Sequence, residues 1–206
     1  MKSVLLAGDS ISIDYRKYLF PMLADRINIF GRDGNEEAYK NLDKAIGSNC
    51  GDSSQMLEYV KMLKENGGLN VDYFVFNCGL HDLRTIKATN EHQVSLELYE
   101  KNLSEIITLA KNVGASCIFI NTTPIVSERY PERFSYTRYD SDVDSYNDTA
   151  IKVMKRMDVP VIDLNSFVKS CGPLDDTMFR DHAHFTDERI IEQAQFLKTK
   201  LEEIID

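Results

Sequence analysis

Long apolar segments are absent from this 206-residue sequence. Hydrophobic residues make up 43% of the chain, yet no run approaches the roughly 20 residues that a helix needs to cross a bilayer, so a membrane-spanning protein is not expected. The opening Met1-Lys2-Ser3 leads directly into a strand-like apolar run and leaves no room for the apolar core of a signal peptide. We therefore expect a soluble, cytoplasmic protein.

Positive charge is in deficit. The chain carries 24 Lys and Arg residues against 33 Asp and Glu residues, which gives a net charge of -9. Proteins that bind nucleic acid depend on clustered Lys and Arg residues that contact phosphates. The acidic balance therefore predicts that nucleic acid is not a partner.

Cysteine is scarce, and the residues present show no C-x-x-C spacing: Cys50, Cys78, Cys117 and Cys171. The spacing typical of zinc sites and of thioredoxin-like motifs is thus missing, and we predict reduced thiols. Cys78 and Cys117 lie in strand-like apolar stretches, where a thiol packs as a small hydrophobic group. Cys50 adjoins Gly51, and we assign it a structural rather than a catalytic role.

Internal repeats, low-complexity stretches and linkers are also missing, which predicts a single domain over residues 1–206. A chain of this length can bury roughly 70% of the surface that it exposes when unfolded. The segment Gly8-Asp9-Ser10-Ile11-Ser12-Ile13 lacks the second and third glycines of a dinucleotide-binding fingerprint. We therefore predict no nucleotide cofactor.

Apolar runs of strand length alternate with segments of helical periodicity. This alternation predicts an α/β fold in which helices flank a parallel sheet. The predicted strands are 3–7, 27–30, 73–78, 117–121 and 159–162. The spacing of apolar residues predicts helices around 56–63, 99–110, 143–154 and 190–204, and another over 14–26 that Pro21 would kink or restart.

Two segments near opposite ends of the chain carry the residue types of a nucleophile and its base. Ser10 follows the apolar run 4–7 and a glycine that permits a tight turn, so its hydroxyl is expected at the carboxyl end of a strand, where α/β sheets bind ligands. Asp181 precedes His184 by three residues, so its carboxylate can hold one imidazole nitrogen while the other faces the serine. We predict a catalytic triad of Ser10, Asp181 and His184.

Gly8-Asp9-Ser10-Ile11 and Asp181-x-x-His184 resemble the first and last conserved blocks of the SGNH hydrolases, also called GDSL-type esterases and lipases. Asn49-Cys50-Gly51-Asp52-Ser53 stands where that family has its glycine block, and Gly79-Leu80-His81-Asp82 stands where it has Gly-x-Asn-Asp. Each block alone is typical of an ordinary turn or helix start, but four blocks in the family's order favour membership. The resemblance implies a three-layer α/β/α sandwich of flavodoxin-like type, with a five-stranded parallel sheet whose first strand is central.

The resemblance also implies an oxyanion hole, whose fixed donors stabilise the negative oxygen of a tetrahedral intermediate by about 3 kcal/mol each. By position these donors are the backbone N–H groups of Ser10 and Gly51 and the side chain of residue 81, and Asp9 and Asp82 are supporting residues.

His81 departs from the family pattern, which has an asparagine at this position. A neutral imidazole donates from one nitrogen, so the ring can replace the amide unless that nitrogen points elsewhere, for instance to Asp82. Asn49 and Asn77 are the other amide side chains near these blocks.

His182 is the alternative base. We prefer His184 because its spacing from Asp181 matches the family, whereas His182 directly follows the aspartate and is expected to point away. Asp181, His182 and His184 have no clear further ligand beside them, so no metal site is predicted.

These residues predict a serine esterase without a cofactor. The resemblance implies hydrolysis of carboxylic esters with short acyl or acetyl groups, including esters of carbohydrates or lipids, through an acyl-enzyme on Ser10. One alternative is an acyltransferase or acyl-thioesterase on the same scaffold. Another is a catalytically silent ligand-binding homologue that lost its oxyanion hole through His81.

Two long irregular segments, 31–48 and 124–141, are expected to shape the pocket. The second mixes basic and aromatic residues: Arg129, Tyr130, Arg133, Phe134, Tyr136, Arg138 and Tyr139. We interpret it as a solvated loop whose arginines pair with nearby carboxylates, in preference to a clamp for a substrate carboxylate.

Overall fold

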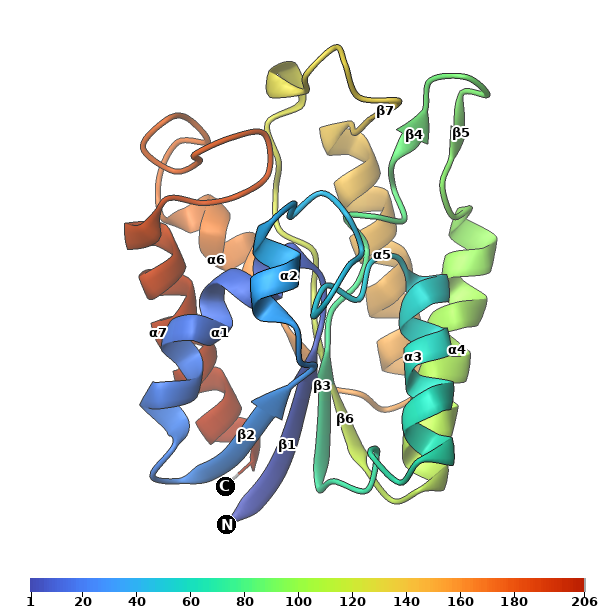
Figure 1. The fold of residues 1–206 in the computed structure, drawn as a ribbon, viewed down its shortest axis with the longest axis vertical. Helices are drawn as coiled ribbons and strands as arrows, with labels where there is room; N and C mark the ends of the chain where they lie inside the picture. Colours follow the sequence, from blue (N-terminus) through green and yellow to red (C-terminus); the bar gives the residue numbers. More distant parts are fainter. Residues whose placement is uncertain (206) are drawn as a thin grey trace.

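The computed structural model describes residues 1–205 and is built around one parallel β-sheet (Figure 1). The strands of this sheet are β1 Lys2–Ala7, β2 Ile27–Gly31, β3 Tyr73–Phe76, β6 Ser116–Ile120 and β8 Val161–Ile162. Their spatial order is β2-β1-β3-β6-β8, and each neighbouring pair is parallel. The five predicted strands are confirmed, but β3 rather than β1 is the middle strand.

The strands are apolar on both faces because helices cover both faces of the sheet. Val4 and Leu6 point to one face of β1 and Leu5 and Ala7 to the other, and all four are at most 2% exposed. Such continuous apolar runs are typical of buried parallel strands.

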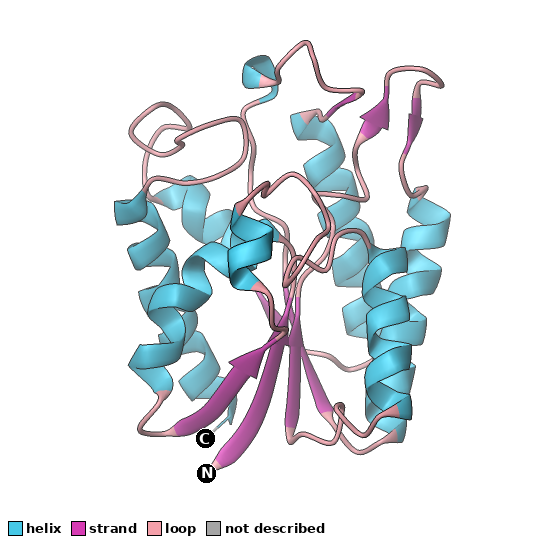
Figure 2. Ribbon diagram, in the orientation of Figure 1, coloured by secondary structure: helices cyan, strands magenta, loops and turns pink. Residues whose placement is uncertain are grey.

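The helices form two layers, one on each face of the sheet (Figure 2). On one side lie α1 Ser10–Leu23, α6 Leu164–Ser170 and α7 Asp187–Ile205, and on the other lie α3 Ser53–Glu65, α4 Leu96–Asn112 and α5 Asp140–Arg156. This is the expected three-layer α/β/α sandwich. Among the helices in residues 1–205, none has the length and apolar character required to cross a membrane.

The helix at 14–26 differs from its prediction. It begins at Ser10, because Asp9 caps its amino end, and it continues through Pro21 to Leu23. The strand predicted at 159–162 is also shorter, since Pro160 has no N–H and contributes only its carbonyl, which accepts from the Phe119 N–H at 3.0 Å.

A second, small antiparallel sheet lies beyond the carboxyl ends of the main strands (Figure 1). It pairs β4 Thr85–Ile86 with β5 Glu91–His92 and with β7 Tyr136–Thr137. The segments that we predicted to be irregular also contain α2 Asn35–Tyr39 and the short helix η1 Ser127–Arg129. Both long segments thus gather at the edge of the main sheet where Ser10 lies.

Candidate active site

Ser10 lies at the junction of β1 and α1, as its sequence position predicted. The Asp9 carboxylate caps α1 by accepting the Ile11 N–H at 3.0 Å, which fixes the turn. Gly8 fits this turn because a Cβ on it would lie 2.8 Å from the Ser12 Oγ. Ser10 is the first residue of α1, so its own backbone N–H has no acceptor within the helix.

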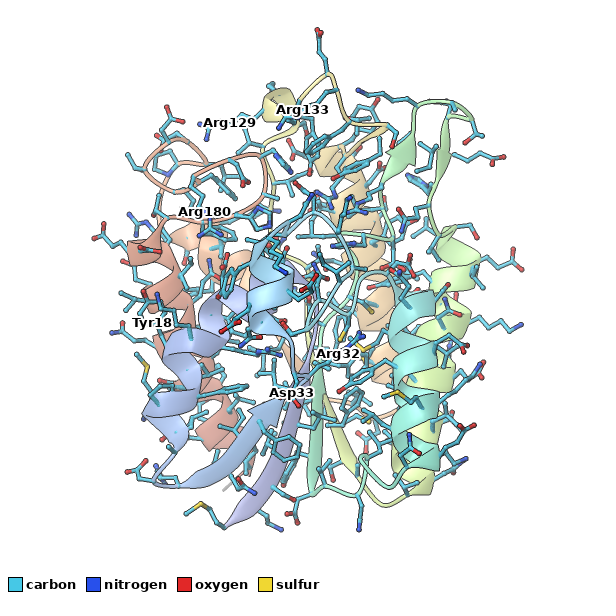
Figure 3. All side chains as sticks on the ribbon, viewed as in Figure 1. Tyr18, Arg32, Asp33, Arg129, Arg133 and Arg180 are labelled. Carbon is cyan, nitrogen blue, oxygen red and sulfur yellow. The ribbon has the colours of Figure 1, made fainter. Side chains whose placement is uncertain are left out.

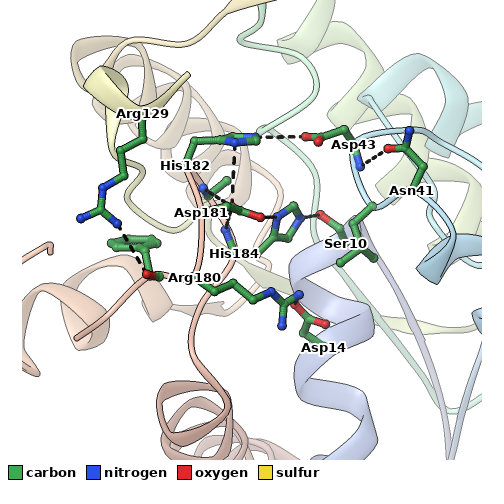
Figure 4. A network of polar contacts seen from close by, with 12 residues as sticks. Ser10, Asp14, Asn41, Asp43, Arg129, Arg180, Asp181, His182 and His184 are labelled. Atoms are coloured by element: carbon green, nitrogen blue, oxygen red, sulfur yellow. Dashed lines mark hydrogen bonds and ion pairs between the residues drawn. The ribbon is translucent and has the colours of Figure 1, made fainter. Parts of the chain in front are cut away.

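The structure brings Ser10, His184 and Asp181 into one series of hydrogen bonds (Figure 4). The His184 Nε2 lies 2.8 Å from the Ser10 Oγ, and the His184 Nδ1 lies 2.8 Å from the Asp181 Oδ2. Ser10 and His184 are both buried, although 174 positions separate them in the chain. The geometry allows Nδ1 to donate to the carboxylate while Nε2 accepts from the hydroxyl.

The ionised form of Asp181 is stabilised by neighbouring hydrogen-bond donors. Burial alone would raise its pKa, but the hydrogen bond and charge of His184 and the N–H groups of Ala183 and His184, each 2.8 Å from Oδ1, hold the pKa below its usual range. Asp181 is therefore ionised at neutral pH and orients the imidazole.

The loop that carries Asp181 and His184 is joined to α1 and closed at its own base. The Arg180 guanidinium contacts the Asp14 carboxylate of α1 at 2.7 Å (Figure 4). The two ends of the loop are also joined to each other, because the ring centroids of Phe179 and Phe185 lie 4.6 Å apart and the two residues form an antiparallel bridge. These contacts keep His184 above the start of α1.

Gly51 has the backbone conformation that only glycine adopts readily, with φ at 69°. A Cβ there would lie 2.0 Å from the Gln55 Oε1, so another residue could not replace it without a shift. Its N–H donates to the Asn49 Oδ1 at 3.0 Å. The second predicted oxyanion donor is thus already engaged by a side chain two residues earlier.

His81 is buried, and neither of its ring nitrogens forms a hydrogen bond with another described residue. Burial, followed by the charges of Arg84, Arg138 and His184, lowers the pKa of His81 well below its usual value, so the ring is neutral. It does not donate to Asp82.

The other two amides near the site are committed elsewhere. The Asn49 Nδ2 donates to the Leu42 carbonyl at 3.0 Å, and the Asn77 Nδ2 donates to the Ile120 carbonyl at 3.1 Å. One donor hydrogen of each amide group is therefore already used by a backbone carbonyl.

Asp82 and Asp9 are both buried carboxyl groups beside the site. The Asp82 Oδ1 accepts the Ser53 N–H at 2.8 Å, which joins the third sequence block to the first residue of α3. Burial raises the pKa of Asp82 to about 8 and that of Asp9 to about 6. Each has one carboxyl oxygen that is buried without a hydrogen-bond partner, so the negative charge of the ionised form is poorly compensated, in agreement with the raised pKa.

A cavity of about 580 Å³ adjoins the series of hydrogen bonds. It is lined by residues 39–44, by residues 133–136 and by Asp181 and His184. The expectation that the two long segments shape a pocket is therefore confirmed.

The interpretation of 124–141 as a solvated loop with paired arginines is correct for Arg129 and wrong for Arg133 and Arg138, which have no carboxylate partner among residues 1–205. Arg129 pairs with Asp176 at 2.6 Å. Arg138 is only 2% exposed and forms no ion pair with the described residues, because its guanidinium donates to the Leu80 carbonyl and to the Tyr130 hydroxyl. Arg133 lines the cavity.

One polar contact was missed in the sequence. The His182 ring forms no hydrogen bond with Ser10, and its Nε2 lies 3.1 Å from the Asp43 Oδ1 (Figure 4). The His182 Nδ1 lies 3.9 Å from the Asp181 Oδ1, so His182 stands between the two carboxylates. No local pattern marks Asp43, because its partner is 139 positions away.

The described part of the chain, residues 1–205, contains no group of three or more His, Cys, Asp or Glu side chains placed to hold a metal ion.

A Ser-His-Asp series at the carboxyl edge of an α/β/α sandwich is the layout of a hydrolase with a serine nucleophile. The sequence matches the GDSL-like lipase/acylhydrolase family over residues 6–188, and the chain belongs to this family.

Solved structures of low sequence identity share the fold. A putative acylhydrolase from Bacteroides fragilis has a TM-score of 0.73 at 17% identity, covering 100% of this chain and 88% of its own. A GDSL-like lipase from Bacteroides thetaiotaomicron has a TM-score of 0.72 at 17% identity, with 98% and 89% covered. An acetyl xylan esterase has a TM-score of 0.69 at 18% identity, with 97% and 99% covered. No curated protein matches the sequence.

Proposed function

We propose that this protein is a serine esterase that hydrolyses carboxylic esters through an acyl-enzyme on Ser10. The observation that carries the proposal is the pair of 2.8 Å contacts that join the Ser10 Oγ to His184 and His184 to Asp181. A neutral imidazole that is oriented by a carboxylate and bonded to a hydroxyl is the arrangement that activates a serine.

In the first step the Ser10 Oγ attacks the ester carbonyl, and the His184 Nε2 takes the hydroxyl proton. The tetrahedral intermediate collapses, the bond to the alcohol oxygen breaks, and the imidazolium gives its proton to that oxygen. Water then attacks the acyl-serine, His184 takes a proton from it, and the carboxylic acid leaves as Ser10 regains its proton. Asp181 stays ionised and stabilises the imidazolium.

Three groups serve as oxyanion donors in this proposal. The Ser10 N–H has no acceptor within α1, and the helix start adds a positive potential. His81 is neutral, and a proton on its buried Nδ1 would be a donor without an acceptor, so we assign the proton to Nε2. The Gly51 N–H contributes if the oxyanion replaces the Asn49 Oδ1 as its acceptor.

We propose short acyl groups as the preferred ones. The cavity beside His184 is not built as a pocket for a long acyl chain, because Leu42 and Phe134 are its apolar side chains apart from two tyrosines.

Labelling with a fluorophosphonate probe, together with a screen of nitrophenyl esters from acetate to long chains, tests the proposal. Wild type should be labelled and should hydrolyse acetate, while Ser10→Ala and His184→Ala should each lose about 10⁶-fold in turnover and their combination little more. Ser145→Ala is the matched control, because this exposed serine on α5 bonds only a carbonyl of its own helix. An unlabelled wild type from mildly acidic to alkaline pH would overturn the proposal and favour a silent binding protein.

The acceptor of the acyl group distinguishes an esterase, which releases it to water, from an acyltransferase, which releases it to another alcohol. Adding alcohols or sugars to the same assay should leave hydrolysis dominant. Dominant transfer at low acceptor concentration would make the protein an acyltransferase instead.

A further inference from the structure

We propose that the cavity beside His184 selects esters whose alcohol part carries a negative charge, such as the carboxylate of a hydroxy acid. This inference rests on the proposed esterase function and names its substrate class. It starts from the position of the cavity: His184 and Asp181 line it, whereas the proposed oxyanion donors Ser10, Gly51 and His81 do not. Because His184 protonates the departing oxygen, the alcohol part lies on this side.

The acidic side chains of the cavity wall are already satisfied by internal partners. The Asp43 Oδ1 lies 3.1 Å from the His182 Nε2 and accepts from the Tyr136 hydroxyl at 3.2 Å. Asp181 is held by His184 and two backbone N–H groups. Both carboxylates therefore face the protein's own donors, which reduces their repulsion of an incoming anion.

The basic side chains of the wall have fewer partners. Lys40 pairs with Glu37 at 2.8 Å, but the Lys44 ammonium and the Arg133 guanidinium have no carboxylate within 4.0 Å among residues 1–205. Arg133 packs over the Phe134 ring at 5.4 Å and lies beyond the carboxyl ends of the main strands (Figure 3). These two cations are free to pair with a substrate.

Two further guanidinium groups lie behind the wall. Arg84 and Arg138 are 7% and 2% exposed, and their guanidinium carbons stand 4.3 and 5.3 Å from the centre of the Tyr136 ring, which lines the cavity. Neither has a carboxylate within 4.0 Å among the described residues, and the Arg84 Nε is buried without a partner.

The charge balance at this edge therefore opposes that of the whole chain. The net charge of -9 repels anions at long range, whereas the cavity has unpaired cations at its surface and beneath it. Buried charges are less screened by salt than exposed ones, so their field extends into the cavity. A neutral alcohol gains nothing from this arrangement, and an anionic one does.

A matched pair of substrates tests the inference. Para-acetoxybenzoate and para-acetoxybenzamide share the acyl group and the ring, and they differ by one negative charge on the alcohol part. At low ionic strength we expect kcat/KM to be about tenfold higher for the benzoate, mainly through KM, and the preference to shrink with added salt.

Charge-removing variants locate the effect. Lys44→Gln and Arg133→Gln should each reduce the preference for the benzoate over the benzamide about threefold. Lys64→Gln is the control, because it removes the same charge from an exposed position near the end of α3, away from the site. It should leave the preference for the benzoate unchanged.

The outcomes separate the two proposals. Equal kcat/KM for both esters, with Ser10 labelled and both esters hydrolysed, would overturn the inference alone. A preference that survives both cavity variants unchanged would also overturn it. Absence of labelling and of hydrolysis of either ester would overturn the esterase function and this inference with it.

Discussion

At the scale of single residues, His81 is the most informative position, because it stands where the family carries an asparagine. An amide has two donor hydrogens, whereas a neutral imidazole has one. The structure keeps this ring buried, neutral and without a hydrogen-bond partner among the described residues. The oxyanion role that we propose for His81 therefore depends on this single donor.

We expect His81→Ala to lower turnover about 10²-fold, as the loss of one oxyanion donor does. His81→Asn, which restores the family's residue, should retain or raise turnover. Steady-state kinetics on nitrophenyl acetate, with thermal unfolding to verify that both variants are folded, is the measurement. Unchanged turnover in the alanine variant would remove His81 from the mechanism.

Asp82 predicts a pH dependence of stability. Burial raises its pKa to about 8, above the value of about 4 in an unfolded chain. The folded state therefore binds the proton more tightly, so the contribution of this group to stability is fully present below pH 4 and is lost as the pH rises to about 8. Asp82→Asn removes this titration and retains an acceptor for the Ser53 N–H.

Urea unfolding between pH 5 and pH 8 measures this effect. The free energy of unfolding of Asp82→Asn should fall less over that interval than that of wild type. Parallel curves for the two proteins would mean that Asp82 titrates normally in the fold.

At the scale of the elements, the start of α3 links stability to the site. Asp52 caps this helix through the Ser54 and Gln55 N–H groups at 3.0 Å, and it also accepts from the Gln93 side chain at 2.6 Å. Gly51 directly precedes it. The same residue therefore stabilises the helix and fixes the backbone of a proposed oxyanion donor.

Asp52→Ala should lose about 1–2 kcal/mol of stability and also lower turnover. Ser95→Ala is the matched control, since Ser95 caps α4 through the Leu98 N–H and lies outside the site. We expect it to lose stability without a loss of turnover, as measured by denaturant unfolding and esterase kinetics. If both variants kept full turnover, the cap would have no part in catalysis.

The elements with a strong periodic signal were the ones that the sequence predicted. The five parallel strands and the long amphipathic helices follow from alternation of apolar runs, and Ser10 was placed because it follows such a run. β4 and β7 have two residues each, and Thr85 pairs with Thr137 across a long stretch of chain, so no local pattern marks them. Arg138 directly follows β7, and its guanidinium donates to the carbonyl of the distant Leu80, so its burial was not predictable from a local pattern either.

Within the site, contacts between residues close in the sequence were predictable, and contacts between distant loops were not. The Asp181 and His184 contact is local and was predictable from spacing, whereas the contact of His182 with Asp43 joins two loops and was not. The engagement of the Gly51 N–H by Asn49 is local, but an asparagine two residues before a glycine fits many turns, so the sequence did not distinguish it.

At the scale of the whole molecule, the four thiols are separate and unequal. None forms a disulfide, and Cys50, Cys78 and Cys117 are buried while Cys171 is partly exposed. Burial raises the pKa of the Cys117 thiol to about 12 and also raises the pKa of the other three thiols, so exposure to solvent distinguishes Cys171.

We therefore expect a thiol reagent to react readily with one cysteine in the native protein and with four in denaturant. Mass spectrometry of the labelled peptide should identify Cys171, and a reducing agent should not change the melting temperature. Rapid native reaction of Cys50 would show that the glycine block opens.

The large sequence separation between Ser10 and His184 also has a consequence for folding. The proposed esterase activity requires that β1 and α1 be packed against the loop that precedes α7, because Ser10 and His184 come from these two parts of the chain. A partly folded chain that has its helices but lacks this contact would have no activity. During refolding, the recovery of esterase activity should therefore be slower than the recovery of the helical circular dichroism signal. The rate of ester hydrolysis would report the formation of the contact between Ser10 and His184.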